Sequence, residues 1–147
     1  MTRASIAELE HRLRIVEGMQ AFFSQPRAPK ATAGDLLAIG ENVLEVWIRA
    51  RGEVPTKEKK EDFRLLALHR QGAKGDPSFN ACRETCRELV YHYNLIVSEP
   101  EHPETPKRLK LMGLVAKHLL LFVSGKMEVA GLGEFCCAAK PLRETGE

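Results

Sequence analysis

The stretch that decides the fold is residues 76–96, DPSFNACRETCRELVYHYNLI. Its apolar side chains recur at steps of three and four residues, which is the spacing of one face of an α-helix. Asp76 followed by Pro77 is a helix start, because proline loses no hydrogen bond at the first helical position. The stretch therefore predicts an amphipathic helix that begins at this pair. Its buried face would consist of Phe79, Cys82, Cys86, Leu89, Tyr93 and Ile96.

Helical spacing also dominates the chain before this stretch. We expect one helix over about 5–25, ended by Pro26 and Pro29, and a second from a cap at Thr32 to about Arg51. Gly52 ends the second helix. A third helix is expected to open at 55–56, with a charged first turn over 57–62, and to end near 72–75.

After the quoted stretch, three prolines within 98–106 predict a loop that returns the chain. A fifth helix is expected over about 106–124, closed by Gly125, and a last one over about 127–139. No segment alternates polar and apolar residues over the length of a strand. The sequence thus predicts an all-α fold, a single compact bundle of five to six helices with short loops. It would span residues 1–142 and leave a frayed tail at 143–147.

Composition places the chain among ordinary globular domains. It has 147 residues, 44% hydrophobic and 29% charged. Only 6% are aromatic, so the core is expected to be aliphatic. The most apolar stretch, 111–123, is shorter than the roughly 20 residues that span a membrane, and the first residues lack the apolar run of a secretory signal. We therefore expect no membrane partner, a cytoplasmic location and cysteines that remain thiols.

The cysteines are the first candidates for chemistry. Cys82 and Cys86 are one helical turn apart, and Cys136 lies on the stripe of the last predicted helix. Together with His118 they are the candidate ligands of a metal- or redox-dependent protein. The competing interpretation is packing, because buried cysteine behaves as a small hydrophobe. His69 ends the third predicted helix and is expected to be exposed.

Basic residues are the second candidates. The net charge is only +2, but eight cations and four acids fall within 49–75. Nucleic acid or an acidic protein could bind the basic 49–64 part of this region or the cations at the start of the fifth helix. The interleaved signs of 57–62 are instead typical of a solvated helix face, and cations at the start of the fifth helix favour an acidic neighbour such as the 99–104 loop. The candidate binding residues are Arg49, Arg51, Lys59, Lys60, Lys107 and Arg108.

No nucleophile turn, phosphate loop or helical metal-ligand pair stands out, so no catalysis and no cofactor are expected. The second and fifth predicted helices carry apolar residues on more than one face. Such excess apolar width indicates either a central helix or an interface. We therefore expect a small non-catalytic helical protein that acts through protein–protein contact, as an adaptor, accessory or oligomerising module. Its partner would be another protein or a second copy of the chain.

Overall fold

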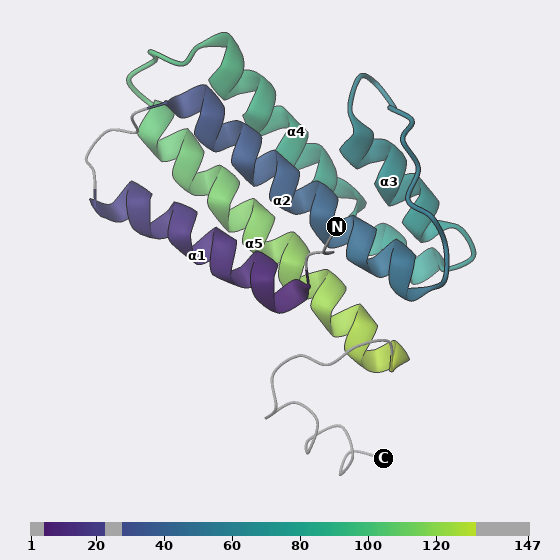
Figure 1. Ribbon diagram of the computed structural model, residues 1–147. Helices are drawn as coiled ribbons and strands as arrows, with labels where there is room; N and C mark the ends of the chain where they lie inside the picture. Colours follow the sequence, from purple (N-terminus) through teal and green to yellow (C-terminus); the bar gives the residue numbers. More distant parts are fainter. Residues whose placement is uncertain (1–4, 23–27, 132–147) are drawn as a thin grey trace.

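The computed structural model describes residues 5–22 and 28–131. Within these residues it contains five α-helices and one short 3₁₀ helix, and no strand (Figure 1). The prediction of an all-α bundle is confirmed. The elements are α1 (Ile6–Phe22), α2 (Pro29–Ala50), α3 (Arg64–Ala73), η1 (Pro77–Cys82), α4 (Arg83–Ser98) and α5 (Thr105–Ala130).

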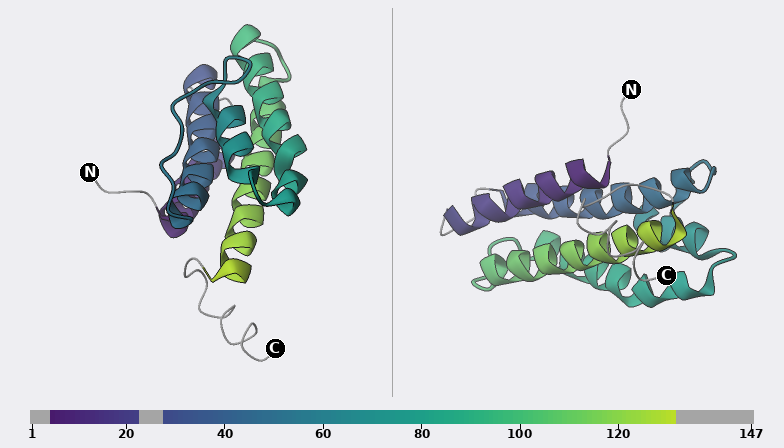
Figure 2. Two further views of the ribbon diagram at one scale, coloured as in Figure 1. Left: turned by 90° about the vertical axis from the view of Figure 1, so that its right-hand side faces the viewer. Right: turned by 90° about the horizontal axis from the view of Figure 1, so that it is seen from below.

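Four long helices, α1, α2, α4 and α5, run side by side along the bundle (Figure 2). α5 packs against α1, α2 and α4, while α2 packs against α1, α3, α4 and α5. The shorter α3 lies against α2, α4 and η1. The second and fifth predicted helices are thus both central. No helix in the described part of the chain is long and apolar enough to cross a membrane.

The core is aliphatic around one aromatic centre. The ring of Trp47 stacks on Phe79, with 4.9 Å between centroids, and its indole N–H donates a hydrogen bond of 3.0 Å to the carbonyl of Gly72. The quoted stretch is buried where its spacing predicts: Phe79, Cys82, Cys86, Leu89 and Ile96 are each at most 1% exposed. Only Tyr93 of that stripe is half-buried.

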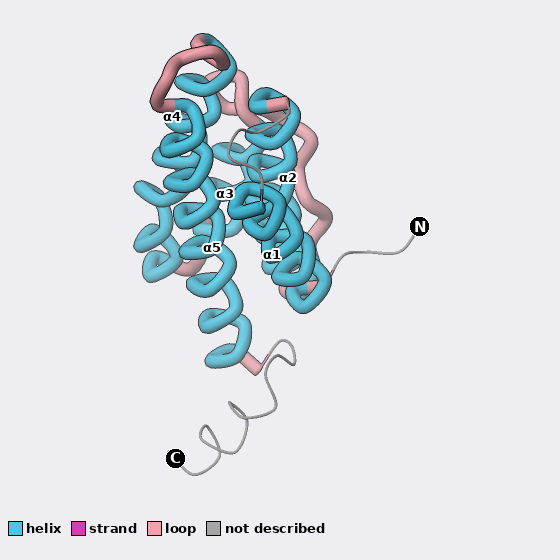
Figure 3. The backbone as a smooth tube through the Cα atoms, turned by 90° about the vertical axis from the view of Figure 1, so that its left-hand side faces the viewer, coloured by secondary structure: helices cyan, strands magenta, loops and turns pink. Residues whose placement is uncertain are grey.

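The prediction places the start of the third helix about eight residues too early. Residues 52–59 are irregular, and α3 starts only at Arg64 (Figure 3). Just before it, Glu61 and Asp62 have φ values of 54° and 72°, which no right-handed helix allows. Lys60 and Phe63 exchange two backbone hydrogen bonds of 2.9 Å around them, which closes a tight turn. The charged segment 57–62 is therefore part of a long connection, and this connection is not short as predicted.

Two helix starts also differ from the prediction. α2 begins at Pro29, about one turn before Thr32, because proline suits the first helical position. The quoted stretch begins as the 3₁₀ helix η1 and becomes α-helical only at Arg83. The Asp76 carboxylate does not cap this start. It accepts hydrogen bonds from Ser78 and Lys126 instead.

The predicted break at Gly125 is wrong. α5 runs without interruption through this residue to Ala130, and Gly131 ends it with a φ of 71°. A single helical glycine costs about 1 kcal/mol relative to alanine, which a long packed helix tolerates. No separate helix begins at Met127, since residues 127–130 belong to the last turn of α5. Residues 132–147, including Cys136 and the predicted tail, lie outside the described residues.

Candidate functional site

The cysteine pair sits where η1 meets α4. Cys82 is the residue that precedes the first turn of α4, and Cys86 follows one turn later. Both are free thiols with at most 1% exposure. The Cys82 thiol donates a hydrogen bond of 3.2 Å to the carbonyl of Phe79. The pair is therefore packed into the core, as the apolar stripe predicts.

The two thiols differ in acidity because they share a hydrogen bond. The Cys86 thiol donates to the Cys82 sulfur and lowers the pKa of Cys82 to about 6, with burial opposing the shift and His69 adding to it. The same hydrogen bond, together with burial, raises the pKa of Cys86. Cys82 is therefore the more acidic thiol of the pair.

His69 is the residue of this cluster that sequence reasoning placed wrongly. It is buried, 6% exposed, with its Nε2 atom 3.3 Å from the carbonyl oxygen of Phe79. Its ring also stacks near that of Phe79, with 5.7 Å between centroids. The signal was available, because His69 follows Leu65 and Leu66 by four and three residues and so shares their face of α3.

Of the other predicted metal ligands, the one that the structure describes does not join the pair. His118 is exposed on α5, and Cys136 lies outside the described residues. Among residues 5–22 and 28–131, no three His, Cys, Asp or Glu side chains are arranged to hold a metal ion. Among the described residues, the structure thus brings together Cys82 and Cys86 but not His118, and the place of Cys136 stays a prediction.

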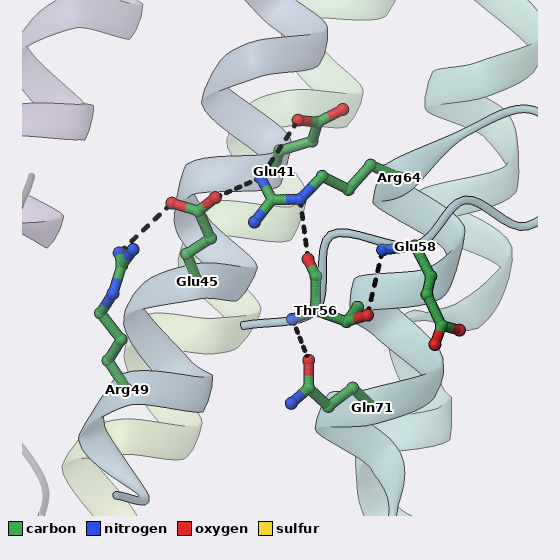
Figure 4. Close-up of polar contacts among 7 residues, drawn as sticks. All are labelled: Glu41, Glu45, Arg49, Thr56, Glu58, Arg64 and Gln71. Atoms are coloured by element: carbon green, nitrogen blue, oxygen red, sulfur yellow. Dashed lines mark hydrogen bonds and ion pairs between the residues drawn. The ribbon is translucent and has the colours of Figure 1, made fainter. Parts of the chain in front are cut away.

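The arginines near the 51–63 connection have internal partners (Figure 4). Arg64 forms an ion pair with Glu45, lies 3.7 Å from Glu41 and donates a 2.8 Å hydrogen bond to the carbonyl of Thr56. Arg49 binds the other carboxylate oxygen of Glu45 at 3.3 Å. Burial raises the pKa of Glu41 even though Arg64 opposes the shift. This network joins α2 to the connection that follows it.

Arg51 also turns toward the interior. Its guanidinium donates a 3.1 Å hydrogen bond to the carbonyl of Gly72 and lies 5.3 Å from the centre of the Trp47 ring. The arginines of the 49–64 region are therefore engaged within the fold, while Lys59 is exposed. Binding of nucleic acid by this region stays a prediction.

The remaining predicted binding residues lie apart from one another. Lys60 lines a pocket formed with α3 and the start of α4. At the start of α5, Lys107 is exposed and Arg108 forms an ion pair of 3.2 Å with Glu99. The acidic neighbour expected from the 99–104 loop is thus confirmed for Arg108.

The outer face of α5 carries three exposed leucines. Leu111, Leu114 and Leu121 are 40%, 52% and 53% exposed. Leu111 and Leu114 form one wall of a groove of about 340 Å³ between α4 and α5. The polar wall of this groove includes Glu88 and His92.

His92 contributes an unusual atom to this groove. Its Nδ1 is buried and has no hydrogen-bond partner among the described residues. Burial lowers the pKa of His92, although nearby Glu88 opposes the shift. The groove thus combines exposed leucines, one acid and a histidine ring nitrogen that has no hydrogen-bond partner among the described residues.

Comparison of the chain with protein-family profiles, with curated proteins and with solved structures finds no match.

Proposed function

We propose that the protein acts through protein–protein contact, and that the outer face of α5 is its surface for a second copy of the chain. The observation that carries the proposal is the half-exposed row of Leu111, Leu114 and Leu121 on a helix that is already central to the bundle. Exposed apolar side chains that form a contiguous row favour an interaction surface over an ordinary solvated face.

The spacing of the row supports a helical partner. Leu111, Leu114, His118 and Leu121 follow one another at steps of three, four and three residues. This is the repeat of the contact seam in a coiled coil, in which each side chain of the seam packs between side chains of the facing helix. A second α5 offers the same seam and is therefore a suitable partner.

Charge favours a parallel pairing of the two copies. On one side of the seam, Glu88 lines the groove with α4. On the other side, Lys117 lies next to Arg14 and Glu10 of α1, and Lys110, seven residues earlier, falls on the same side, so that this side carries a net positive charge. In a parallel pair the twofold axis runs along the helices. The lysine side of each copy then faces the glutamate side of its partner. An antiparallel pair would instead place lysine opposite lysine.

Sedimentation equilibrium of the full chain at micromolar concentration tests this proposal. Leu114→Asp places a charge in the seam, and Ile15→Asp is the matched control, because Ile15 is 50% exposed on α1. We expect a dimer for the wild type and the control. For Leu114→Asp we expect a dissociation constant at least about tenfold higher, equivalent to about 1.4 kcal/mol.

Two results would contradict self-association through this face. One is a wild-type chain that stays monomeric across the concentration range, which leaves a different protein as the candidate occupant. The other is an equal weakening by Leu114→Asp and Ile15→Asp, which would place the contact elsewhere. Circular dichroism of both variants checks that each retains its helical content.

A thiol redox reaction is the second candidate function, favoured by the shared hydrogen bond of Cys82 and Cys86. Residues one helical turn apart have Cβ atoms about 5–6 Å apart, farther than the roughly 3.5–4.5 Å of a disulfide, so a bond between Cys82 and Cys86 requires the start of α4 to rearrange. Oxidation would join the two sulfurs and release two protons and two electrons. A small disulfide would accept the electrons and yield two thiols.

Mass spectrometry after incubation with glutathione disulfide tests the redox candidate. The wild type should lose the mass of two hydrogens, and peptide mapping should place the new bond between Cys82 and Cys86. In the Cys86→Ser variant, peptide mapping should find no disulfide at Cys82, whatever change of mass arises at Cys136 and Cys137. A wild type whose native form never loses the two hydrogens would exclude the reaction, as expected of purely structural buried thiols.

A further inference from the structure

A pocket of about 620 Å³ opens between the 51–63 connection, α3 and the start of α4. This volume lies within the range of about 300–1,000 Å³ that is usual for small-molecule sites. The pocket lies apart from the seam of α5, because none of the exposed leucines of that helix lines it. Its ligand is therefore a separate question from self-association.

The lining of the pocket carries an excess of positive charge. Lys60, Arg70, Lys74 and Arg83 contribute four cations, and Glu58 is the single acid among the lining residues. These cations come from three different segments of the chain, so no run of sequence reveals the cluster. The formal sum of the lining charges is +3.

Little of this charge is neutralised within the fold. Lys60 and Lys74 make no ion pair within 4.0 Å of a described acid, although the Glu61 carboxylate, just outside the lining, interacts electrostatically with Lys60 and Arg83. Arg70 lies 3.7 Å from Glu58, and Arg83 lies 4.0 Å from Glu84, with all four side chains more than half exposed. Long, exposed ion pairs contribute little to stability, so a ligand can exchange them at small cost.

The wall formed by the connection is held in place before any ligand arrives. The Gln71 side chain accepts a 2.8 Å hydrogen bond from the backbone N–H of Thr56 and donates a 2.9 Å bond to the carbonyl of Val54. Arg64 donates to the carbonyl of Thr56 from the other side (Figure 4). A fixed wall lowers the ordering cost of binding.

The turn at 61–62 fixes Lys60 in the same wall. Left-handed φ values at two consecutive residues other than glycine, Glu61 and Asp62, are strained. Arg87 stabilises this turn through two hydrogen bonds to the Glu61 carboxylate, of 3.1 and 3.4 Å. Strained backbone is concentrated at sites that bind ligands, and here it adjoins one of the four cations of the pocket.

We propose that this pocket binds a small molecule that carries a diphosphate group. Two linked phosphates carry a charge of about −3 near neutral pH, which matches the lining charge. The guanidinium groups of Arg70 and Arg83 can each bind two phosphate oxygens, and the lysines add point charges. The side chains of Thr56 and Asn80 supply neutral polar contacts for the rest of the ligand.

Isothermal titration calorimetry of the full chain with inorganic pyrophosphate, at low ionic strength, tests the proposal. We expect the double variant Lys60→Gln/Arg70→Gln to weaken binding at least about tenfold. The matched control is Lys30→Gln/Arg12→Gln, which removes one lysine from an exposed position on α2 and one arginine from an exposed position on α1, both outside the pocket and the seam. The control should bind pyrophosphate as the wild type does. Orthophosphate should bind at least about tenfold more weakly than pyrophosphate, because it fills fewer of the cation positions.

Three outcomes would overturn the inference. The first is no heat of binding with millimolar pyrophosphate. The second is equal weakening in the pocket and control variants, which would indicate nonspecific attraction to a basic chain. The third is equal affinity for orthophosphate and pyrophosphate, which would exclude a diphosphate site. If the double variant melts early, Lys74→Gln alone replaces it, since Lys74 is exposed and makes no hydrogen bond through its side chain to a described residue.

Discussion

α2 and α5 both carry apolar residues on more than one face, but the fold covers these faces of α2 and leaves one of them exposed on α5. Both helices lie at the centre of the bundle. The fold covers the apolar surface of α2, since α1, α3, α4 and α5 all pack on it. α5 is covered only by α1, α2 and α4, and its fourth side leaves leucines in solvent. Apolar width therefore shows that a helix needs more than one covering surface, without showing what covers it.

The difference between the two helices comes from α3 and the connection before it. Gly72 at the end of α3 accepts the Trp47 indole hydrogen bond, and Arg64 at its start reaches the carboxylates of α2. No described element does the same for the outer face of α5. This difference in covering should appear as a difference in the free energy of unfolding that each helix contributes.

The largest expected effect is on the covered helix. Trp47→Ala should lower the free energy of unfolding by about 3–5 kcal/mol, because it opens a cavity in the aromatic centre. Leu114→Ala on α5 should change the stability of the monomer by less than about 0.5 kcal/mol. Urea unfolding of dilute samples measures both. Similar losses would show that the face of α5 is structurally covered after all.

The polar side of α2 should show a smaller effect. Arg64→Gln leaves the half-buried Glu41 without its ion-pair partner and Glu45 with Arg49 alone, and should cost about 1–3 kcal/mol. Arg49→Gln is the control, because an ion pair between residues four apart on a helix contributes only about 0.3–0.5 kcal/mol. Urea unfolding again provides the measurement. Equal costs would mean that Arg64 does not fix the connection to α2.

A pair of glycine substitutions should change stability by about 1 kcal/mol in opposite directions. A Cβ on Gly40 of α2 would lie 2.6 Å from Leu89 and 3.2 Å from Leu65, so Gly40→Ala should destabilise through overpacking. A Cβ on Gly125 of α5 meets nothing within 4 Å, so Gly125→Ala should stabilise through helix propensity. Thermal unfolding distinguishes the two signs. A stabilising Gly40→Ala would show that the core around α2 has spare room.

The smallest expected effect is a dependence on pH at the α4–α5 groove. Burial lowers the pKa of His92 below its ordinary value of 6.5. The unfolded chain then binds the proton more readily than the folded chain, so stability falls as the pH drops below about 6.5. NMR titration of the imidazole measures the pKa, and His92→Gln should remove this part of the pH dependence. A pKa at or above 6.5 would contradict the burial of this ring.

The fold could be predicted where the local pattern and the tertiary environment agree. The stripe from Phe79 to Ile96 is buried as its spacing requires. The helix predicted over 57–62 does not form, because hydrogen bonds from Gln71 and Arg64 hold the adjoining chain in a non-helical path. At Gly125, the helix continues because glycine opposes a helix only weakly.

The candidate sites likewise divide into contacts within one helix, which spacing predicts, and contacts between segments, which it does not. The proximity of Cys82 and Cys86 follows from their spacing alone, since one helical turn separates them. The burial of His69 beside them depends on how α3 packs against η1. The four cations of the pocket come from segments that only the fold brings together. Spacing within a helix thus predicts contacts inside one element, and it says little about contacts between elements.

The sequence by itself determined the all-α class, the buried stripe of 79–96 and the excess apolar width of two helices, because helical periodicity is a local property. Only the tertiary structure decided that α2 is covered while α5 keeps an exposed seam, and that the arginines near the 51–63 connection turn inward while its Lys60 joins a pocket. The physical reason is that covering and charge clustering depend on which distant segments pack together. That choice depends on the whole chain.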